Sequence, residues 1–506
     1  MTTLTARLPR LDLVALAWVT GLGLAGALAI VLGNGAPALA FLPLVLLGVL
    51  ALVAFQPLRR TLLVVAFLAL VLENPAESFG SGLWKSPIAT LGALYLMQLK
   101  QTIGGGLIVT GLDLSLALVA FTWLVRRMRG STIDAGGQVA TASPIVWAAG
   151  VCYATIAFME VWGIARGGSF ASSLWQLFRV IYLPGVVLLF AAALRGGRDA
   201  PALARLLVIA AIYRAILAII IRSQFPDLEQ MPHATTHADS MLFANACVLV
   251  LANLYERPGK QSAWTAVGVL PVVVWGMIAN NRRLVWVELL MALAVITVLT
   301  GWSPIKRRLS QAAILALPFF LVYVAVGWSH PTGVFAPVKT IRSVVDSDSD
   351  TSTKWRDWEN YNLYATFAKN PLVGTGYGHE YDEVVHLPDI SANYDLYRLA
   401  PHNSVLGILA YGGAVGFAGL FLMIPLGMFF AVRTYRRAIA ARDRIAALTA
   451  IGVFVTYLNH CYGDMALGTY TSVITVGATL ALVGKLAVST GAWPVGAPRA
   501  AGPAGP

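Results

Sequence analysis

Charged residues are scarce in this 506-residue chain. Asp, Glu, Lys and Arg make up only 12% of it, whereas hydrophobic residues make up 58%. A soluble protein of this length could not bury so much apolar surface. The scarcity of charge therefore excludes a soluble globular protein and indicates an integral membrane protein.

Cysteine is rarer still, with three residues in the whole chain. Cys152, Cys247 and Cys461 each fall inside or at the end of an apolar run, without metal-ligand spacing or an evident disulfide partner. Cysteine usage therefore does not define a redox compartment.

Acidic residues are also few, with 24 Asp and Glu against 36 Lys and Arg. Such an excess can indicate a nucleic-acid partner, but here the basic residues occur in short clusters between apolar runs, where they set membrane topology. We therefore expect a lipid bilayer, and no nucleic acid, as the partner of these charges.

Apolar runs near the ~20 residues that span a bilayer fill most of the chain. They predict an all-α, polytopic membrane bundle of about fourteen transmembrane helices, with a range of about 12 to 14. The runs cover residues 12–32, 38–56, 61–72, 106–125, 144–163, 173–194, 202–222, 239–255, 263–279, 284–301, 311–328, 403–432, 445–463 and 466–487.

The N-terminus superficially resembles a signal peptide, because Arg7 and Arg10 precede a hydrophobic run and "APALA" follows it at 36–40. The run from Leu11 to Leu32 is too long for a signal sequence, and apolar sequence resumes at Phe41. We interpret it as an uncleaved first helix.

Basic clusters follow the even-numbered runs, which predicts a cytoplasmic N-terminus and a cytoplasmic C-terminus by the positive-inside rule. The clusters are Arg59/Arg60, Arg126/Arg127/Arg129, Arg195/Arg198, Arg257/Lys260, Lys306/Arg307/Arg308 and Arg433/Arg436/Arg437/Arg442/Arg444. The loops of opposite parity, including 223–238, 280–283, 329–402 and 464–465, should face outward, and the chemistry is expected there.

Segment 329–402 is the one long polar stretch. It divides the chain into transmembrane helices at 1–328, an external domain at 329–402, transmembrane helices at 403–487 and a flexible cytoplasmic tail at 488–506. The stretch "KWRDWENYNLYATFAK" predicts a short helix that ends at Asn370-Pro371, because helices stop before proline.

Four motifs carry weak signals for other chemistry. "DSDSD" at 346–350 lacks the later Gly and Glu of a calcium loop, and "GTGYG" at 374–378 lacks a dinucleotide-binding context, so tight turns are its expected purpose. His233 and His237 could chelate zinc only on a helix, but Pro232 favours an irregular loop. His460 is either a partner of nearby Asp464 or an interfacial histidine.

Arginines that defy the inside bias are more informative. Arg214 lies deep in an apolar run, where a charge costs at least ~2.5 kcal/mol and requires a polar interior or a partner. Arg222, Arg179, Arg282 and Arg283 lie near the outer side, either as snorkelling side chains or, together with Arg356, as a receptor for an anionic headgroup that each could bind in bidentate fashion.

His402 is the last outward residue before the twelfth predicted helix. An imidazole can accept a proton from a hydroxyl near neutral pH, which is the task of a general base. The alternative is a capping or interfacial histidine hydrogen-bonded to Asn403.

Three segments in this order resemble the superfamily of O-antigen ligases and Wzy-type polysaccharide polymerases: "NNRRLVWVELL", "WRDWENYNLYATFAKNPLVGTGYG" and "PHNSVLGILAYGGAVG". By this resemblance Arg282 or Arg283 matches the first arginine of the family, Arg356 the second and His402 the histidine. The family usually has Ser-Arg-Gly at the first position, whereas Asn281 and Arg283 flank Arg282 here, which leaves the choice between the two arginines open.

The resemblance implies a GT-C-like, metal-independent and inverting glycosyltransferase without a cofactor. Its donor would be a polyprenyl-diphosphate-linked glycan, and its acceptor a glycan or glycolipid at the outer face of the bacterial cytoplasmic membrane. A ligase and a polymerase, which differ in acceptor, are both compatible with it; a flippase for lipid-linked glycan and a non-catalytic scaffold are alternatives. The expected catalytic residues are His402, Arg356, Arg282 and Arg283, and the expected substrate-binding residues are Arg214, Arg222, Arg179, Asn403, Trp355, Trp358 and Tyr361; the aromatic ones could instead anchor the external helix at the interface.

Overall fold

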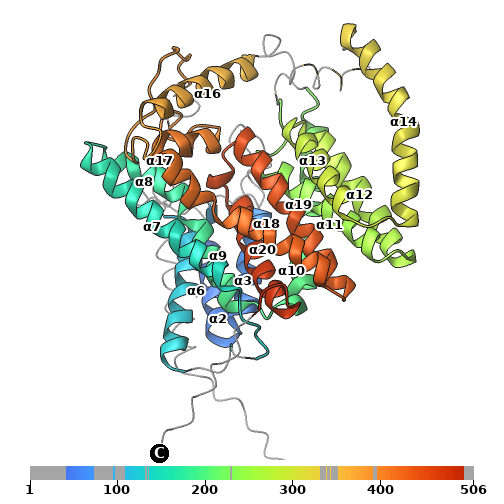
Figure 1. Ribbon diagram of the computed structural model, residues 1–506, viewed down its shortest axis with the longest axis horizontal. Helices are drawn as coiled ribbons and strands as arrows, with labels where there is room; N and C mark the ends of the chain where they lie inside the picture. Colours follow the sequence, from blue (N-terminus) through green and yellow to red (C-terminus); the bar gives the residue numbers. More distant parts are fainter. Residues whose placement is uncertain are drawn as a thin grey trace, which may run out of the picture. The chain divides into compact units, whose positions relative to one another are not determined.

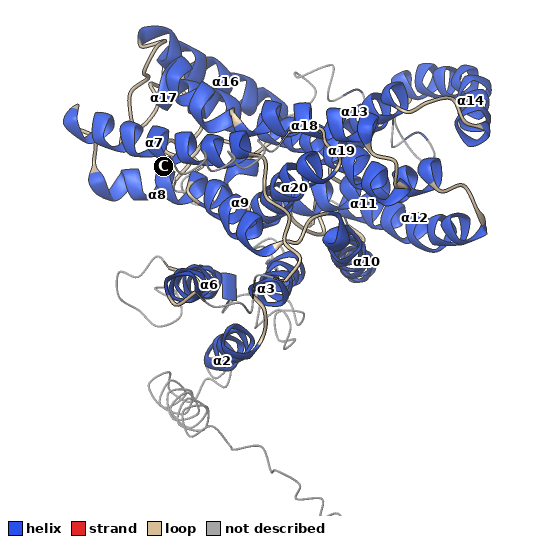
Figure 2. Ribbon diagram, turned by 60° about the horizontal axis from the view of Figure 1, so that its bottom comes forward, coloured by secondary structure: helices blue, strands red, loops and turns tan. Residues whose placement is uncertain are grey.

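The computed structural model of the chain describes residues 41–72, 95–96, 109–130, 134, 136–227, 231–330, 335, 338, 342, 351–390 and 396–494. Every regular element within these ranges is a helix (Figures 1 and 2), which confirms the all-α prediction for this part of the chain. The chain divides into two compact units, Met1–Gly136 and Gly137–Pro506.

The first unit contains α2 (Phe41–Phe55), α3 (Leu58–Leu72) and α6 (Gly111–Met128). A capping box starts α6: the Thr110 side chain accepts from the backbone N–H of Asp113, and the Asp113 carboxylate accepts from that of Thr110. These helices correspond to the predicted runs 38–56, 61–72 and 106–125. The predicted first helix at 12–32 lies outside the described residues.

The second unit holds the helices that build the candidate site. They are α7 (Ser143–Ala165), α8 (Phe170–Val180), α9 (Tyr182–Ala193), α10 (Ala200–Gln224), α11 (His237–Glu256), α12 (Lys260–Asn280), α13 (Leu284–Leu299), α14 (Pro304–Ser329), α16 (Thr351–Lys369), α17 (Ser404–Phe421), α18 (Met423–Arg437), α19 (Ala441–Gly463) and α20 (Tyr470–Ser489). Apolar side chains of α11, α19 and α20 are almost all buried and form the centre of this unit.

Eight helices of the described residues are long and apolar enough to cross a membrane, or nine if the bent pair α8 and α9 forms one span. That pair covers the predicted run 173–194, and its two arms meet at 43°. α13 has 16 residues, fewer than the ~20 that span a bilayer. The predicted total of about fourteen spans therefore stays a prediction.

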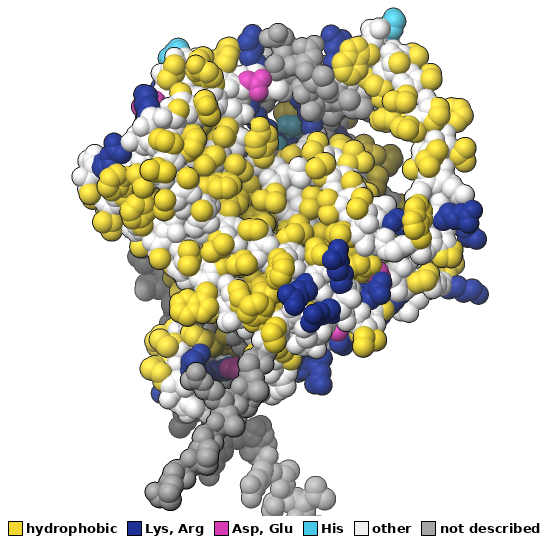
Figure 3. All heavy atoms as spheres, viewed as in Figure 1, with side chains coloured by type: hydrophobic (Ala, Val, Ile, Leu, Met, Phe, Trp, Pro, Cys, Tyr) yellow, Lys and Arg dark blue, Asp and Glu magenta, His cyan; other side chains and the backbone are white. Residues whose placement is uncertain are grey.

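The surface of the second unit has the distribution expected of a membrane protein. Figure 3 shows hydrophobic side chains over the middle of the visible face and basic side chains gathered near its lower edge. The basic residues Arg436, Arg437, Arg442 and Arg444 lie where α18 ends and α19 begins. An apolar band with basic residues at one end is typical of a bundle in a bilayer.

The predicted single helix at 403–432 is in fact broken. Gly413 has φ +59° and ψ −160° and interrupts α17, and α18 begins anew at Met423. A Cβ atom at Gly413 would lie 2.4 Å from the carbonyl carbon of Leu372, so only glycine fits there. The backbone N–H groups of Ala414 and Val415 donate instead to Pro371 and Leu372, at 2.8 and 3.0 Å. The turn after α16 is thus inserted into α17.

The glycines of "GTGYG" form tight turns, as expected. Gly374, Gly376 and Gly378 have φ of +64°, +84° and +88°, which favour glycine. A Cβ at Gly376 would lie 2.3 Å from the Cα of Gly163 in α7. This loop therefore needs glycine both for its own turns and for its close approach to α7.

The helix predicted from "KWRDWENYNLYATFAK" is confirmed as α16, which ends at Lys369, before Asn370-Pro371. The buried amide of Asn362 accepts from the backbone N–H groups of Val384 and Val385, at 2.9 and 2.7 Å, and donates to the carbonyl of Val385. These bonds hold the following loop against α16 and keep the helix in place beside the start of α17.

Candidate active site

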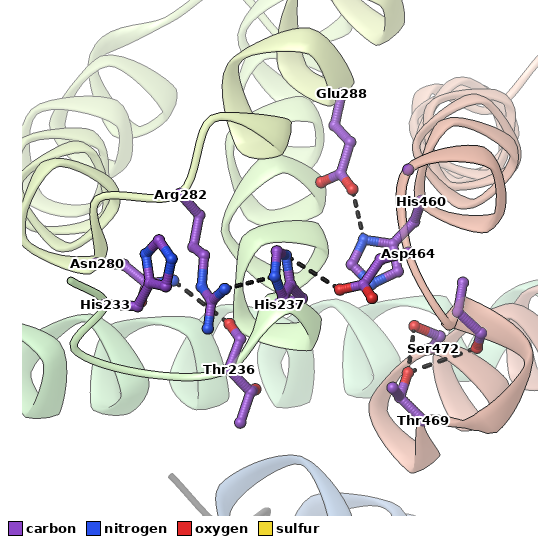
Figure 4. Close-up of polar contacts among 12 residues, drawn as sticks. His233, Thr236, His237, Asn280, Arg282, Glu288, His460, Asp464, Thr469 and Ser472 are labelled. Carbon is purple, nitrogen blue, oxygen red and sulfur yellow. Dashed lines mark hydrogen bonds and ion pairs between the residues drawn. The ribbon is translucent and has the colours of Figure 1, made fainter. Parts of the chain in front are cut away.

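Segments far apart in the sequence bring ionisable side chains together at one end of the second unit. They are the start of α11, the turn between α12 and α13, helix α16, the residues before α17 and the end of α19. Figure 4 shows the start of α11, the turn before α13 and the end of α19. In Figure 3 the surface between α16 and α13 is hollowed, and histidine and basic side chains are visible in the hollow. We call this group the polar cluster; its central residues are His237, Arg282, Arg356, His402 and Asp464.

Arg282, His237 and Asp464 form a continuous chain of polar contacts (Figure 4). Arg282 contacts Nε2 of His237 through Nη1 and donates from Nη2 to the carbonyl of Thr235, at 3.2 Å. Nδ1 of His237 lies 3.0 Å from Oδ2 of Asp464. Because a guanidinium only donates, Nε2 of His237 accepts, and the proton of the neutral ring lies on Nδ1, facing Asp464.

The turn between α12 and α13 places Arg282 in this chain. Asn281 adopts the left-handed conformation, with φ +53°, and ends α12. Asparagine tolerates this conformation better than most residues, because its side chain bonds locally. Here its amide donates to the carbonyl of Pro232, at 3.0 Å. The "NNRR" motif is thus a helix stop that directs the first arginine inward.

Arg356 reaches the same place from α16. Its Nη1 donates to the carbonyl of Gly463, at 3.0 Å, immediately before Asp464. Burial alone would raise the pKa of Asp464, but the electrostatic influence of His237, followed by that of His460, Arg356 and His402, holds the pKa of Asp464 well below its usual range. Asp464 therefore stays ionised among polar side chains from four segments.

Burial also affects the cations themselves. It lowers the pKa of Arg282 to about 10; the carboxylate of Asp464 opposes this change and the charge of Arg356 adds to it. Arg282 and Arg356 both interact electrostatically with one central carboxylate, Asp464. The cluster can therefore accept further negative charge, as a phosphate group would supply.

His402 lies between a carboxylate and an aromatic ring, both from α16. Its Nδ1 is 3.3 Å from Oε1 of Glu359, and its backbone N–H donates to both oxygens of that carboxylate, each at 3.3 Å. The indole of Trp355 meets the imidazole edge to face, with ring centroids 5.2 Å apart. Glu359 is fully buried. The ring is therefore fixed on two sides.

The cap of α17 is Asn403, and not His402, for which a capping role was the alternative to catalysis. Its Oδ1 accepts from the backbone N–H groups of Val405 and Leu406, at 3.1 and 3.0 Å, which starts α17. Its Nδ2 donates to Oδ1 of Asn360 in α16, at 3.0 Å. The His-Asn pair thus separates two tasks, because Asn403 begins the helix and His402 stays outside it.

The other side chains predicted to bind substrate differ in their contacts and exposure. Nη1 of Arg283 lies 3.4 Å from Oγ1 of Thr353, at the start of α16. Trp358 stacks beneath the ammonium of Lys354, and Tyr361 is 54% exposed. Their roles in substrate binding stay predictions. Arg179 lies in α8, but its side chain is not among those described.

Arg222 is held by backbone carbonyls of the loop before α11 and of the end of α12. Its guanidinium donates to Ala279, Phe225 and Met231, at 3.0, 3.3 and 2.8 Å, and to Pro232 at 3.3 Å. The arginine thereby ties the loop before α11 to the end of α12, next to Arg282.

Arg214 has the partner that its depth required. The side chain is 1% exposed and forms a bidentate ion pair with Asp239 of α11, at 2.7 Å from Nε and 2.6 Å from Nη2. Asp239 follows His237 by two residues in the first turn of α11. The pair therefore joins α10 to the helix that carries His237.

Breaking this pair should destabilise the protein. We expect Arg214→Met alone to lower the free energy of unfolding by about 3–5 kcal/mol, because it leaves the Asp239 carboxylate buried without its cation. The double variant Arg214→Met with Asp239→Leu should regain most of the loss. Thermal unfolding of the wild type, both single variants and the double variant in detergent measures the coupling; additive losses would contradict it. Transfer by the folded double variant shows whether Arg214 also binds substrate.

Sequence reasoning did not foresee the carboxylates of this site. The sequence places Glu359 only within a predicted short helix, and Asp464 only beside His460. His460 is fully buried and its Nδ1 lies 2.6 Å from Oε1 of Glu288 in α13, so the interfacial interpretation of this histidine is wrong. Glu288 stood inside an apolar run, and that isolated charge was the available signal.

His233 and His237, whose spacing was considered for zinc but not favoured, have different partners. His233 bonds to the carbonyl of Asn281, at 3.1 Å, whereas His237 turns to Arg282 and Asp464. Burial, followed by the charge of Arg282, lowers the pKa of His233 to about 3. Within the described ranges no group of three or more His, Cys, Asp or Glu residues could hold a metal ion.

Comparison with known proteins places these residues in a family. The family model described as O-antigen ligase, Wzy_C, matches residues 259–421. The match begins just before α12 and ends with α17, so it contains Arg282, Arg283, Arg356, Glu359 and His402. A search of curated proteins finds no match. Residues 259–421 are therefore similar to the O-antigen ligase family, within a chain whose described helices include eight that are long and apolar enough to cross a membrane.

Proposed function

We propose that this chain is a membrane glycosyltransferase that transfers a glycan from a polyprenyl-diphosphate donor to a sugar hydroxyl of an acceptor. The observation that carries the proposal is the meeting of Arg282, Arg356 and His402 around Asp464. The O-antigen ligase domain supports the same class of enzyme.

The donor diphosphate would bind between Arg282 and Arg356. Guanidinium groups bind phosphate oxygens in bidentate fashion, and both side chains come from rigid helix ends or helices. Arg283, beside the first turn of α16, would bind the outer phosphate. As the glycosidic bond to phosphate breaks, negative charge grows on the departing diphosphate, and these fixed cations stabilise it.

The acceptor would be activated by His402. Its imidazole takes the proton of the acceptor hydroxyl while the hydroxyl oxygen attacks the anomeric carbon of the donor glycan. The bonding electron pair of the anomeric carbon–oxygen bond leaves with the polyprenyl diphosphate. Attack from the face opposite the leaving group inverts the configuration at this carbon, and His402 later releases the proton to water.

The other predicted residues would act around this centre. Arg222 and Arg214 keep the loop and helix that carry His237 in place, and Trp355 packs on the His402 ring. Trp358, Tyr361 and Arg179 are proposed to face glycan or headgroup. The proposed orientation puts the polar cluster outside the cytoplasmic membrane and both termini inside, because the basic clusters lie at the opposite ends of the helices.

The test uses purified protein in detergent with one defined polyprenyl-diphosphate-linked repeat unit. A ladder of longer products identifies a polymerase, because donor and acceptor are then the same molecule. Product formation only after addition of a second glycan or glycolipid identifies a ligase. If no acceptor becomes covalently joined to glycan, while the same protein moves the lipid across liposomes, the transferase proposal is wrong and a flippase is indicated.

A further inference from the structure

Glu359 carries a charge in a place where a charge is costly. The residue is fully buried in the middle of α16, and an ionised carboxylate removed from water requires compensating hydrogen bonds or a cation. Its described partners are the backbone N–H and the ring Nδ1 of His402. The described hydrogen bonds of this buried carboxylate all go to one residue, His402.

The spacing along α16 adds a second feature. Glu359 follows Arg356 by three residues and Trp355 by four, and residues at these spacings share one helix face. From that face Arg356 reaches Gly463 and Trp355 meets the imidazole. One rigid helix thus fixes the distance between the proposed diphosphate-binding arginine and the group that holds the proposed base.

We propose that Glu359 is the positioning residue that makes His402 a competent base, an inference that rests on the proposed transferase function. A carboxylate accepts but does not donate, so the Nδ1 contact holds the ring proton of neutral His402 on Nδ1. In this tautomer Nε2, on the ring edge opposite Glu359, is the nitrogen that would take the proton of the acceptor hydroxyl. The two bonds from the backbone N–H keep the carboxylate itself from turning.

The same contact stabilises the charged state that the reaction creates. When the acceptor hydroxyl gives its proton to Nε2, the oxygen bonds to the anomeric carbon and the diphosphate departs with the bonding pair. The imidazole becomes an imidazolium beside a buried carboxylate, as in His-Asp pairs of hydrolases. Trp355 prevents the ring from rotating away during this step.

The decisive variant is Glu359→Gln, which keeps the shape and an acceptor oxygen but removes the charge. We expect kcat to fall at least about tenfold, with the KM for the donor unchanged within about twofold, because donor binding does not use Glu359. The acid limb of the kcat profile should move to lower pH, since an amide stabilises the protonated ring less. Glu359→Asp, which keeps the charge, should restore part of the rate and the original position of the limb.

Two further variants separate this role from a structural one. Asp357→Asn removes an exposed carboxylate from the same helix and should leave kcat and its pH profile as in the wild type. Asp464 also interacts electrostatically with His402, and Arg356 lies on the same helix face as Glu359. The pH profile of kcat for Asp464→Asn therefore shows how far the position of the acid limb depends on the rest of the polar cluster.

The outcomes are distinct from those of the proposed function. If the wild type joins glycan to no acceptor, the transferase proposal fails. If the wild type is active and Glu359→Gln has an unchanged kcat and acid limb, Glu359 does not position the base. If Glu359→Gln and Glu359→Asp lose thermal stability and kcat to the same extent, and the acid limb of the kcat profile does not move, the role of Glu359 is structural. This outcome also overturns the inference.

Discussion

Replacement of Arg356 by alanine is expected to lower kcat/KM for the lipid-linked donor by about 10²–10³-fold. In the structure this guanidinium reaches the end of α19 beside Asp464, and Arg282 approaches the same carboxylate through His237. Without Arg356, the negative charge that develops on the diphosphate loses one of its fixed cations in a site largely shielded from water. Steady-state transfer with a labelled donor at saturating acceptor measures the effect.

The form of the side chain should matter as well as its charge. Arg356→Lys keeps the charge but loses the planar fork that binds two phosphate oxygens, so it should recover only part of the activity. Lys369→Ala is the matched control, because it removes an exposed cation from the other end of α16, where it pairs with Asp382. A rate for Arg356→Ala equal to that of this control would remove Arg356 from donor binding.

Replacement of His402 by asparagine should abolish most transfer, with kcat lower by about 10²–10⁴-fold, while donor binding survives. The asparagine amide can still donate to Glu359, but it cannot take a proton from a hydroxyl at neutral pH. The variant therefore removes the base and keeps the contact that orders the segment before α17. Rates of transfer and retention of radiolabelled donor in nanodiscs without acceptor provide the two readouts.

Another histidine of the external segment supplies the comparison. His386→Ala removes an 88% exposed imidazole that contacts Glu383, and it should transfer glycan at the wild-type rate. Undiminished turnover by His402→Asn would exclude His402 as the base. Loss of donor retention together with turnover would instead assign His402 to donor binding.

Several elements of this protein were predictable because a bilayer leaves the chain few choices. Backbone groups in hydrocarbon must be satisfied within a helix, so long apolar runs such as 144–163 and 445–463 become α7 and α19. Local chemistry determined the ends of other elements: proline at 371 limits α16, and the asparagine at 403 caps α17. These effects act over one or two turns of chain.

The interruption of α17 shows where such local effects end. Gly413 lies in an unbroken apolar run, and glycine is common in transmembrane helices, so composition alone indicates one continuous helix. The break requires the backbone of Leu372 to enter the helix and to accept the hydrogen bonds that the helix gives up. Hydropathy does not contain that contact.

What the sequence determined by itself is therefore the membrane-embedded, all-helical character, the chemistry of α16 and the histidine before α17. Only the tertiary structure decided that Glu359 contacts His402 and that Arg214 pairs with Asp239. It also decided that His237 connects Arg282 to Asp464 in the polar cluster. The physical reason is that hydropathy and helix caps depend on neighbouring residues. The partner of a buried charge depends on which helices pack together, and that choice follows from complementary side-chain shapes across the whole bundle.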